Sequence, residues 1–181
     1  MEFFSLSQCV GYIAFVLGVI AFIQKKDRPL KFYVGLESLA YTVHFFLLGN
    51  TPAAASALIT SGRSFVAMKT RSLLLAVIVI IANVSVGFAL AGHGTGWIPV
   101  IGSCIATYAV FTMRGIPMRL AILSSTFCWL ANNIISGSIG GTLLEAVIAT
   151  VNTYTIVQMF RLSAKTRSEE PAGEPIPLTR G

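Results

Sequence analysis

LLLAVIVIIANVSVGFALA, residues 73–91, is an apolar stretch that contains no charged residue. An α-helix rises about 1.5 Å per residue, so this stretch is long enough to cross the roughly 30 Å hydrocarbon core of a bilayer. Lys69 and Arg71 lie just before it, whereas the connection after it, AGHGTG at 91–96, has no Lys or Arg. The stretch therefore predicts one membrane crossing between a basic side and a neutral side.

The composition places the whole chain in the same class. Apolar residues make up 55% and charged residues 11% of its 181 residues, and the mean hydropathy is +0.78. Soluble domains have about 45–50% apolar and about 25% charged residues. We therefore predict an all-α integral membrane protein with seven transmembrane helices. The predicted spans are 5–24, 30–49, 52–70, 73–91, 97–113, 117–136 and 139–160.

Apart from Arg63, the basic residues before position 168 cluster at alternate connections. They lie at 25–31, 69–71, 114–119 and 161–167, while the connections at 49–52, 91–96 and 136–138 contain no Lys or Arg. Positively charged connections stay in the cytoplasm, so we expect the N-terminus outside and the C-terminus in the cytoplasm. Residues 162–181 are polar and rich in proline, which predicts a disordered cytoplasmic tail.

A shift of 88 residues superposes the first three spans on the last three. Pro29 falls on Pro117 and Gly49 on Gly137. Three helices reverse the direction of the chain, and the single helix between the copies restores it. We therefore predict a 3+1+3 parallel repeat: a first triple-helix bundle at 1–72, an inverting linker helix at 73–96 and a second triple-helix bundle at 97–161. Parallel repeats occur in SWEET-type transporters, whose substrate site lies between the halves.

Charged residues at membrane depth need a partner or water. Glu37 and Arg63 lie at similar depths from the cytoplasmic face, which predicts an ion pair that serves as a structural clamp or as a gate. His44 and Glu145 lie at similar depths from the outer face, which predicts a contact between the halves, with Asn132 as the other candidate partner of Glu145. Glu145 has no assured cation beside it and is the better candidate for proton coupling.

Helical spacing places Glu37, Tyr41 and His44 on one face of the second span. The shift of 88 residues relates this face to Ser125, Trp129 and Asn132 of the sixth span. We expect the two faces to line a shared cavity, because an aromatic ring plus a polar group from each half can hold a small polar ligand. The alternative is that the polar residues only join helices. The candidate substrate contacts are Tyr41, Trp129, Asn132 and Asn152.

No motif indicates catalysis, a metal or a cofactor. The two histidines and three scattered cysteines lack metal-ligand spacing, and the chain has neither a nucleophile elbow nor a phosphate-binding loop. Topology explains the basic residues, so no nucleic-acid partner is expected. We expect a non-enzyme that works as a monomer among membrane lipids and binds a small-molecule substrate. A membrane hydrolase that uses Glu or Ser residues is a weaker alternative.

Four segments resemble a known family. They are HFFLLGNTPAAASA at 44–57, KTRS at 69–72, WIPVIGS at 97–103 and SGSIGGTLLE at 136–145. Over residues 8 to 161 the chain resembles the bacterial inner-membrane proteins of the YgjV type, which are grouped with the SWEET and PQ-loop superfamily. The resemblance implies a multi-pass protein of the bacterial inner (cytoplasmic) membrane with a SWEET-like fold. The chain has no Pro-Gln pair, which departs from the PQ-loop pattern, and the resemblance implies no particular substrate.

Two functional hypotheses follow. The first is a carrier that moves a small polar metabolite, for example a sugar, by rocking two three-helix halves about a midplane site. The second is a non-transporting membrane receptor or assembly subunit built on the same frame. Alternating access requires a cavity, so a midplane filled by packed side chains would favour the second hypothesis.

Overall fold

The computed structural model describes residues 4–24, 27–92 and 94–169. These ranges form seven α-helices and no strand, which confirms the predicted all-helical class. The helices begin within a few residues of the predicted spans, because turn-forming Gly, Asn, Pro and Ser residues separate the apolar stretches. They are α1 (Leu6–Ile23), α2 (Asp27–Leu47), α3 (Thr51–Ala67), α4 (Leu73–Leu90), α5 (Trp97–Thr112), α6 (Gly115–Ile135) and α7 (Ile139–Glu169).

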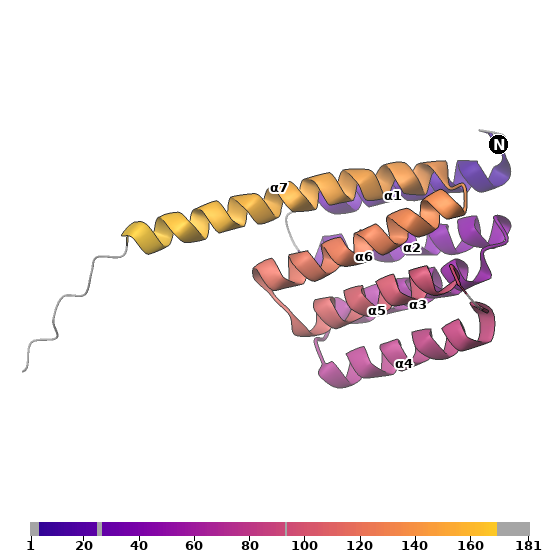
Figure 1. Ribbon diagram of the computed structural model, residues 1–181, viewed down its shortest axis with the longest axis horizontal. Coiled ribbons are helices and arrows are strands. Elements are labelled where there is room, and N and C mark those ends of the chain that lie inside the picture. Colours follow the sequence, from indigo (N-terminus) through magenta and orange to yellow (C-terminus); the bar gives the residue numbers. More distant parts are fainter. Residues whose placement is uncertain (1–3, 25–26, 93, 170–181) are drawn as a thin grey trace, which may run out of the picture.

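The helices lie side by side along a common axis, and successive helices run in opposite directions (Figure 1). α1 packs against α2 and α7, and α2 packs against α3. α3 also contacts α5, α5 contacts α6, and α6 contacts α7. These contacts close a ring of six helices. α4 lies outside the ring, against α3 and α5.

The two ends of the bundle differ in charge. The end at which α2, α4 and α6 begin is called here the basic end, and the opposite end, which holds the connections from α2 to α3, α4 to α5 and α6 to α7, is called the neutral end. α1 begins at the neutral end, and α7 projects beyond the bundle past the basic end (Figure 1). The residues that give the basic end its charge are Arg28, Lys31, Lys69, Arg71, Arg114 and Arg119.

The two turns that lead into α3 and α7 have the same construction. Gly49 and Gly137 end the preceding helices with φ of 77° and 68°, a left-handed conformation that favours glycine. The next residue in each turn caps the following helix. Asn50 Oδ1 accepts from the Ala53 amide at 3.1 Å, and Ser138 Oγ accepts from the Gly141 amide at 3.1 Å.

Apolar side chains cover the outside of the bundle, and small polar residues fill much of its interior. Phe88 of α4 is 77% exposed, whereas Ser103 and Thr107 of α5 are fully buried. This is the reverse of a soluble protein. By length and composition alone, only α4 and the segment Ile139–Ala164 qualify as membrane spans, while Leu6–Ala21 and Trp97–Thr112 are apolar but shorter. α2, α3 and α6 do not qualify by this measure, because each contains more polar residues.

The first and last helices of the ring approach each other closely. A Cβ atom added at Gly140 of α7 would lie 2.7 Å from the carbonyl oxygen of Gly11 in α1. Glycine is therefore required at this contact, as at many close helix crossings in membranes.

α7 is longer than predicted. The helix continues to Glu169, because no Gly or Pro interrupts the segment before Pro171. Residues 162–169 are therefore helical rather than disordered. The rest of the predicted tail, 170–181, lies outside the described residues.

Candidate functional site

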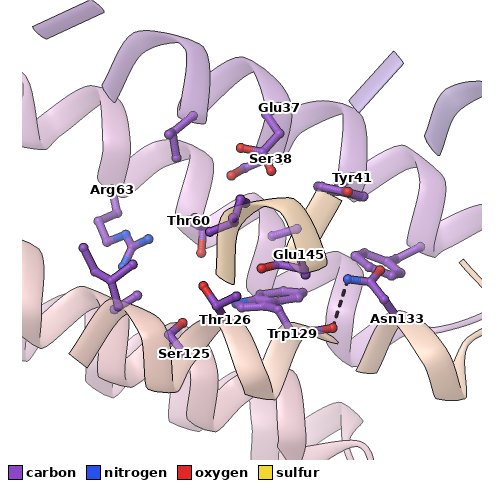
Figure 2. Close-up of a pocket in the computed structure, with 16 residues that line it drawn as sticks. Glu37, Ser38, Tyr41, Thr60, Arg63, Ser125, Thr126, Trp129, Asn133 and Glu145 are labelled. Atoms are coloured by element: carbon purple, nitrogen blue, oxygen red, sulfur yellow. Dashed lines mark hydrogen bonds between the residues drawn. The ribbon is translucent and has the colours of Figure 1, made fainter. Parts of the chain in front are cut away.

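A cavity of about 130 Å³ lies inside the ring, between α2 and α3 on one side and α6 and α7 on the other (Figure 2). It is called here the central cavity, and it is large enough for several water molecules or a small ligand. Its polar and aromatic lining comes from both halves of the chain: Glu37, Ser38, Tyr41, Phe45, Thr60, Arg63, Ser125, Thr126, Trp129, Asn133 and Glu145.

Three charged residues line the central cavity. Glu37 comes from α2, Arg63 from α3 and Glu145 from α7, and each is more than nine-tenths buried. Arg63 Nη1 donates to Thr107 Oγ1 of α5 at 2.9 Å. Within the described ranges, neither carboxylate forms an ion pair or a side-chain hydrogen bond. The predicted Glu37–Arg63 pair is therefore not formed: equal depth brings both residues to one cavity, but the guanidinium bonds to α5.

Three aromatic side chains lie across the interior of the helix bundle, on the neutral side of the cavity. Tyr41 stacks on Phe45 with ring centroids 5.4 Å apart, and Phe45 stacks on Trp129 at 6.0 Å. Tyr41 and Phe45 belong to α2 and Trp129 belongs to α6. The stacked rings therefore join the two halves and separate the cavity from the neutral end.

Hydrogen bonds between the halves lie beyond these rings, at the neutral end. Asn50 Nδ2 donates to Asn132 Oδ1 at 2.9 Å and to Ser136 Oγ at 2.6 Å. These three residues are called here the neutral-end clamp. Gln8 Nε2 also donates to the Gly137 carbonyl at 2.8 Å. The neutral end of the cavity is thus closed by specific polar contacts as well as by packing.

His44 is part of the same closure. Its ring is fully buried, with Nδ1 2.6 Å from the Ser7 carbonyl and Nε2 2.7 Å from Ser138 Oγ. A carbonyl only accepts, so Nδ1 carries a proton, and Nε2 of the neutral ring accepts from the Ser138 hydroxyl. The predicted contact between His44 and Glu145 is wrong, because both ring nitrogens bond elsewhere.

The basic side of the central cavity is not closed in this way. A second cavity, of about 190 Å³, shares Val34, Arg63, Ala106 and Ile122 with the central one and reaches Lys31 and Arg71. A third, of about 280 Å³, shares Lys31 and Arg71 with the second and is also lined by Arg28 and Lys69. The three cavities thus follow one another from the middle of the bundle to the basic end, and neighbouring cavities share lining residues.

Of the predicted site residues, the structure brings five together in the central cavity: Glu37, Tyr41, Arg63, Trp129 and Glu145. Asn132 and Asn152, predicted as substrate contacts, do not line it. Asn132 accepts from Asn50, not from Glu145, and Asn152 Nδ2 donates to the Arg119 carbonyl at 3.0 Å, which joins α7 to α6. Both asparagines therefore connect helices, as the alternative interpretation of polar stripes expected.

Phe45 and Asn133 are cavity residues that the sequence analysis missed. The lining of α2 follows Glu37, Tyr41 and Phe45, a spacing of i, i+4 and i+8. The predicted face used i+7, which selected His44 and, by the shift of 88, Asn132. Trying i+8 as well as i+7 on both spans would have found Phe45 and Asn133.

Comparisons with known proteins agree on the family. Residues 5–163, which include α1 to α6 and most of α7, match the family Imp-YgjV, described as bacterial inner membrane protein. The inner membrane protein YgjV of Escherichia coli (strain K12) is 36% identical over 165 residues, which cover 91% of this chain and 90% of that protein. No solved structure matches. The helical bundle fits a multi-pass protein, and the chain belongs to the YgjV family of bacterial inner membrane proteins.

Proposed function

We propose that this protein is an inner-membrane carrier that moves a small polar metabolite through the central cavity by alternating access. The observation that carries the proposal is the asymmetry of the cavity. Polar contacts between the halves close its neutral side, while its lining continues to the basic end. This is the arrangement expected of one of the two end states of a carrier. The carrier works as a single chain among membrane lipids, without a cofactor or a catalytic step.

Matching features of the two halves support the parallel repeat. Adding 88 to the bounds of α2 gives 115–135, which are the bounds of α6, and adding 88 to the first residue of α3 gives the first residue of α7. Asn50 N donates to the Phe45 carbonyl and Ser138 N to the Asn133 carbonyl, each at 2.9 Å and at equivalent positions. The shift relates α1 to α5 and α3 to α7, and the contact between α1 and α7 accordingly has a counterpart between α5 and α3. In this proposal α4 is the inverting helix.

Sidedness in the membrane follows from charge. Positively charged connections stay in the cytoplasm, so in this proposal the basic end faces the cytoplasm and the N-terminus lies outside. The lining of the central cavity then continues toward the cytoplasm. To reach the other state, the halves must break the neutral-end clamp and approach each other at the basic end. The α3–α5 interface, with Thr60 Oγ1 and Ser103 Oγ 3.0 Å apart and Arg63 bonded to Thr107, lies between them.

The second hypothesis, a non-transporting receptor or assembly subunit, expects packed side chains at the midplane. The central cavity weighs against it, because a cavity lined by unpaired carboxylates costs stability. A protein that only needs a rigid frame gains nothing from such a cavity. A carrier requires it.

Sided labelling tests the carrier directly and needs no knowledge of the cargo. Ala57 lines the central cavity and is 3% exposed. We would introduce Ala57→Cys after replacing Cys9, Cys104 and Cys128 with Ser, and treat oriented membrane vesicles with a membrane-impermeant thiol reagent from either face. Lys69→Cys and Thr95→Cys, both at exposed positions, report the sidedness of the basic and neutral ends.

A carrier predicts that the cavity cysteine reacts from both faces and reacts faster from the face that labels Lys69→Cys. Each control cysteine should react from a single face. If the cavity cysteine reacts from one face only, even after long exposure, alternating access is rejected and the receptor hypothesis gains support.

A further inference from the structure

Two carboxyl groups and one guanidinium line the central cavity. Glu37 and Glu145 lie on α2 and α7, on opposite sides of the cavity, and neither has an ion-pair partner within the described ranges. Arg63 is the cationic residue of the lining, and Thr107 holds its guanidinium toward α5. A buried carboxyl group that loses its proton requires a partner, so these two groups can accommodate a ligand group that carries positive charge.

Two further polar groups of the lining lack partners. Tyr41 Oη and Asn133 Oδ1 are buried and make no hydrogen bond, and their side chains are 6% and 1% exposed. The amide oxygen can only accept, and a phenol oxygen can accept. Asn133 Oδ1 lies against Gly141 at the start of α7. Tyr41 Oη and the two carboxyl groups are therefore the acceptors that an ammonium group, with its three N–H donors, would use.

A positive group can also use the aromatic side of the cavity. Tyr41 and Trp129 line it, and the ring faces of Tyr and Trp attract cations. Figure 2 shows Tyr41, Trp129 and Asn133 together on one side of the cavity and Arg63 on the other. Positive charge on a ligand is therefore best accommodated on the side away from Arg63.

The opposite side suits an anionic group. Arg63 lines both the central cavity and the second cavity, so it stands where the cavity turns toward the basic end. Lys31 and Arg71 line the continuation, and Arg28 and Lys69 line the mouth beyond it. A path lined by basic residues attracts an anionic group and disfavours a purely cationic ligand.

From this layout we propose that the cargo is a small zwitterion of the amino-acid type. Its ammonium group lies between Glu37 and Glu145 and donates to Tyr41 Oη. Its carboxylate faces Arg63 and the basic end. This inference rests on the proposed function, since it takes the central cavity as the cargo site, and it names the chemical class of the cargo.

The emission of Trp129 provides a binding assay that is independent of transport. The chain has two tryptophans, and Trp97 contacts Phe88 edge-to-face, outside the central cavity. Trp97→Phe therefore leaves Trp129 as the single tryptophan, whose emission can be excited selectively above the absorption of tyrosine. The full-length Trp97→Phe protein in lipid nanodiscs would be titrated with each of the twenty protein amino acids and with a panel of monosaccharides.

For each amino acid that binds, we would next titrate two analogues, one that lacks the ammonium group and one that lacks the carboxylate. For L-alanine these are lactate, in which a hydroxyl replaces the ammonium group, and ethylamine, which lacks the carboxylate. We expect a saturable change in emission with at least one amino acid and an affinity at least about tenfold lower for both analogues. Equal affinity for the hydroxyl analogue, binding of a monosaccharide instead, or no response to any amino acid would each overturn the inference.

Two pairs of variants locate the binding groups. Tyr41→Phe removes only the unpartnered hydroxyl and should lower the affinity for the amino acid about tenfold without lowering thermal stability, whereas Tyr154→Phe, at a 63% exposed tyrosine, should change neither. Glu145→Gln should lower the affinity for the amino acid and leave the affinity for lactate unchanged. Tyr41→Phe with unaltered affinity would exclude this placement of the ammonium group. The labelling of Ala57→Cys from each face is a separate test, so the proposed class of cargo can be rejected without rejecting the proposed carrier function.

Discussion

A substitution at Asn50 can weaken the contacts that close the neutral end while it keeps the N-terminal cap of α3. Its Oδ1 caps α3 by accepting from the Ala53 amide, while its Nδ2 donates to Asn132 and Ser136 in the other half. Asn50→Ser keeps a good capping residue. A serine occupies the equivalent position before α7, where Ser138 caps the Gly141 amide. The shorter side chain cannot reach across to Asn132 or Ser136.

The expected magnitude follows from the two lost bonds. A hydrogen bond contributes about 0.5–1.5 kcal/mol net, so Asn50→Ser should destabilise the closed neutral end by about 1–3 kcal/mol. That corresponds to a shift of about 5- to 150-fold in the equilibrium between the two states. Ser136→Ala removes one of the two bonds and should shift the equilibrium by about 2- to 12-fold.

The assay is the labelling of Ala57→Cys from each face. The ratio of the outside rate to the inside rate should rise by these factors, most in Asn50→Ser and less in Ser136→Ala. Thermal unfolding in detergent serves as the control for folding. A ratio that stays constant in Asn50→Ser, with an unchanged unfolding midpoint, would refute the role of the neutral-end clamp.

Three further predictions concern the fold. Gly140→Ala should lower the unfolding midpoint in detergent and cost about 1–3 kcal/mol of stability, because its Cβ would lie 2.7 Å from the Gly11 carbonyl oxygen. Gly62→Ala, whose Cβ would meet no neighbouring side chain or helix within 4 Å, should raise the midpoint and add about 0.5–1 kcal/mol of stability; equal effects of the two substitutions would show that the α1–α7 contact is loosely packed. Asn83 is fully buried in α4 and donates to the Val100 carbonyl at 2.9 Å, so Asn83→Ala should cost about 1–3 kcal/mol of stability in the same assay. Ser85→Ala, at an exposed position of α4, should change the stability by no more than about 0.5 kcal/mol. An Asn83→Ala protein as stable as the unsubstituted one would mean that the packing of α4 does not depend on this hydrogen bond. Single cysteines at Lys69 and Thr95 should label from opposite faces of the membrane, and labelling of both from the same face would contradict the predicted topology.

The number of the helices and their bounds, apart from the end of α7, could be predicted from the sequence. Apolar length and turn residues set each helix independently, and the turn residues stand at both helix ends. Gly49 and Asn50 mark one turn, and Gly137 and Ser138 mark its counterpart. Depth in the bundle was predictable for the same reason, since it depends only on the distance along a helix. Glu37 and Arg63 accordingly meet at one cavity.

The partners of individual side chains could not be predicted in the same way. Depth does not say which neighbouring helix a side chain faces, and that depends on how each helix is rotated within the ring. Arg63 bonds to Thr107 rather than to Glu37, and His44 bonds to Ser7 and Ser138 rather than to Glu145. Since α1, α5 and the turn before α7 supply these partners, the missing information was the order of helices around the ring.

The central claim is that two similar halves rock about the central cavity, and distances between spin labels at both ends test it most directly. Leu47 and Ile135 lie on α2 and α6 near the neutral end, and Phe32 and Leu120 lie on the same helices near the basic end; all four are exposed. Labels would be attached to one pair at a time, in the protein with Asn50 and in Asn50→Ser. The account predicts that Asn50→Ser lengthens the Leu47–Ile135 distance and shortens the Phe32–Leu120 distance. Two distances that remain constant, or that change in the same direction, would contradict it.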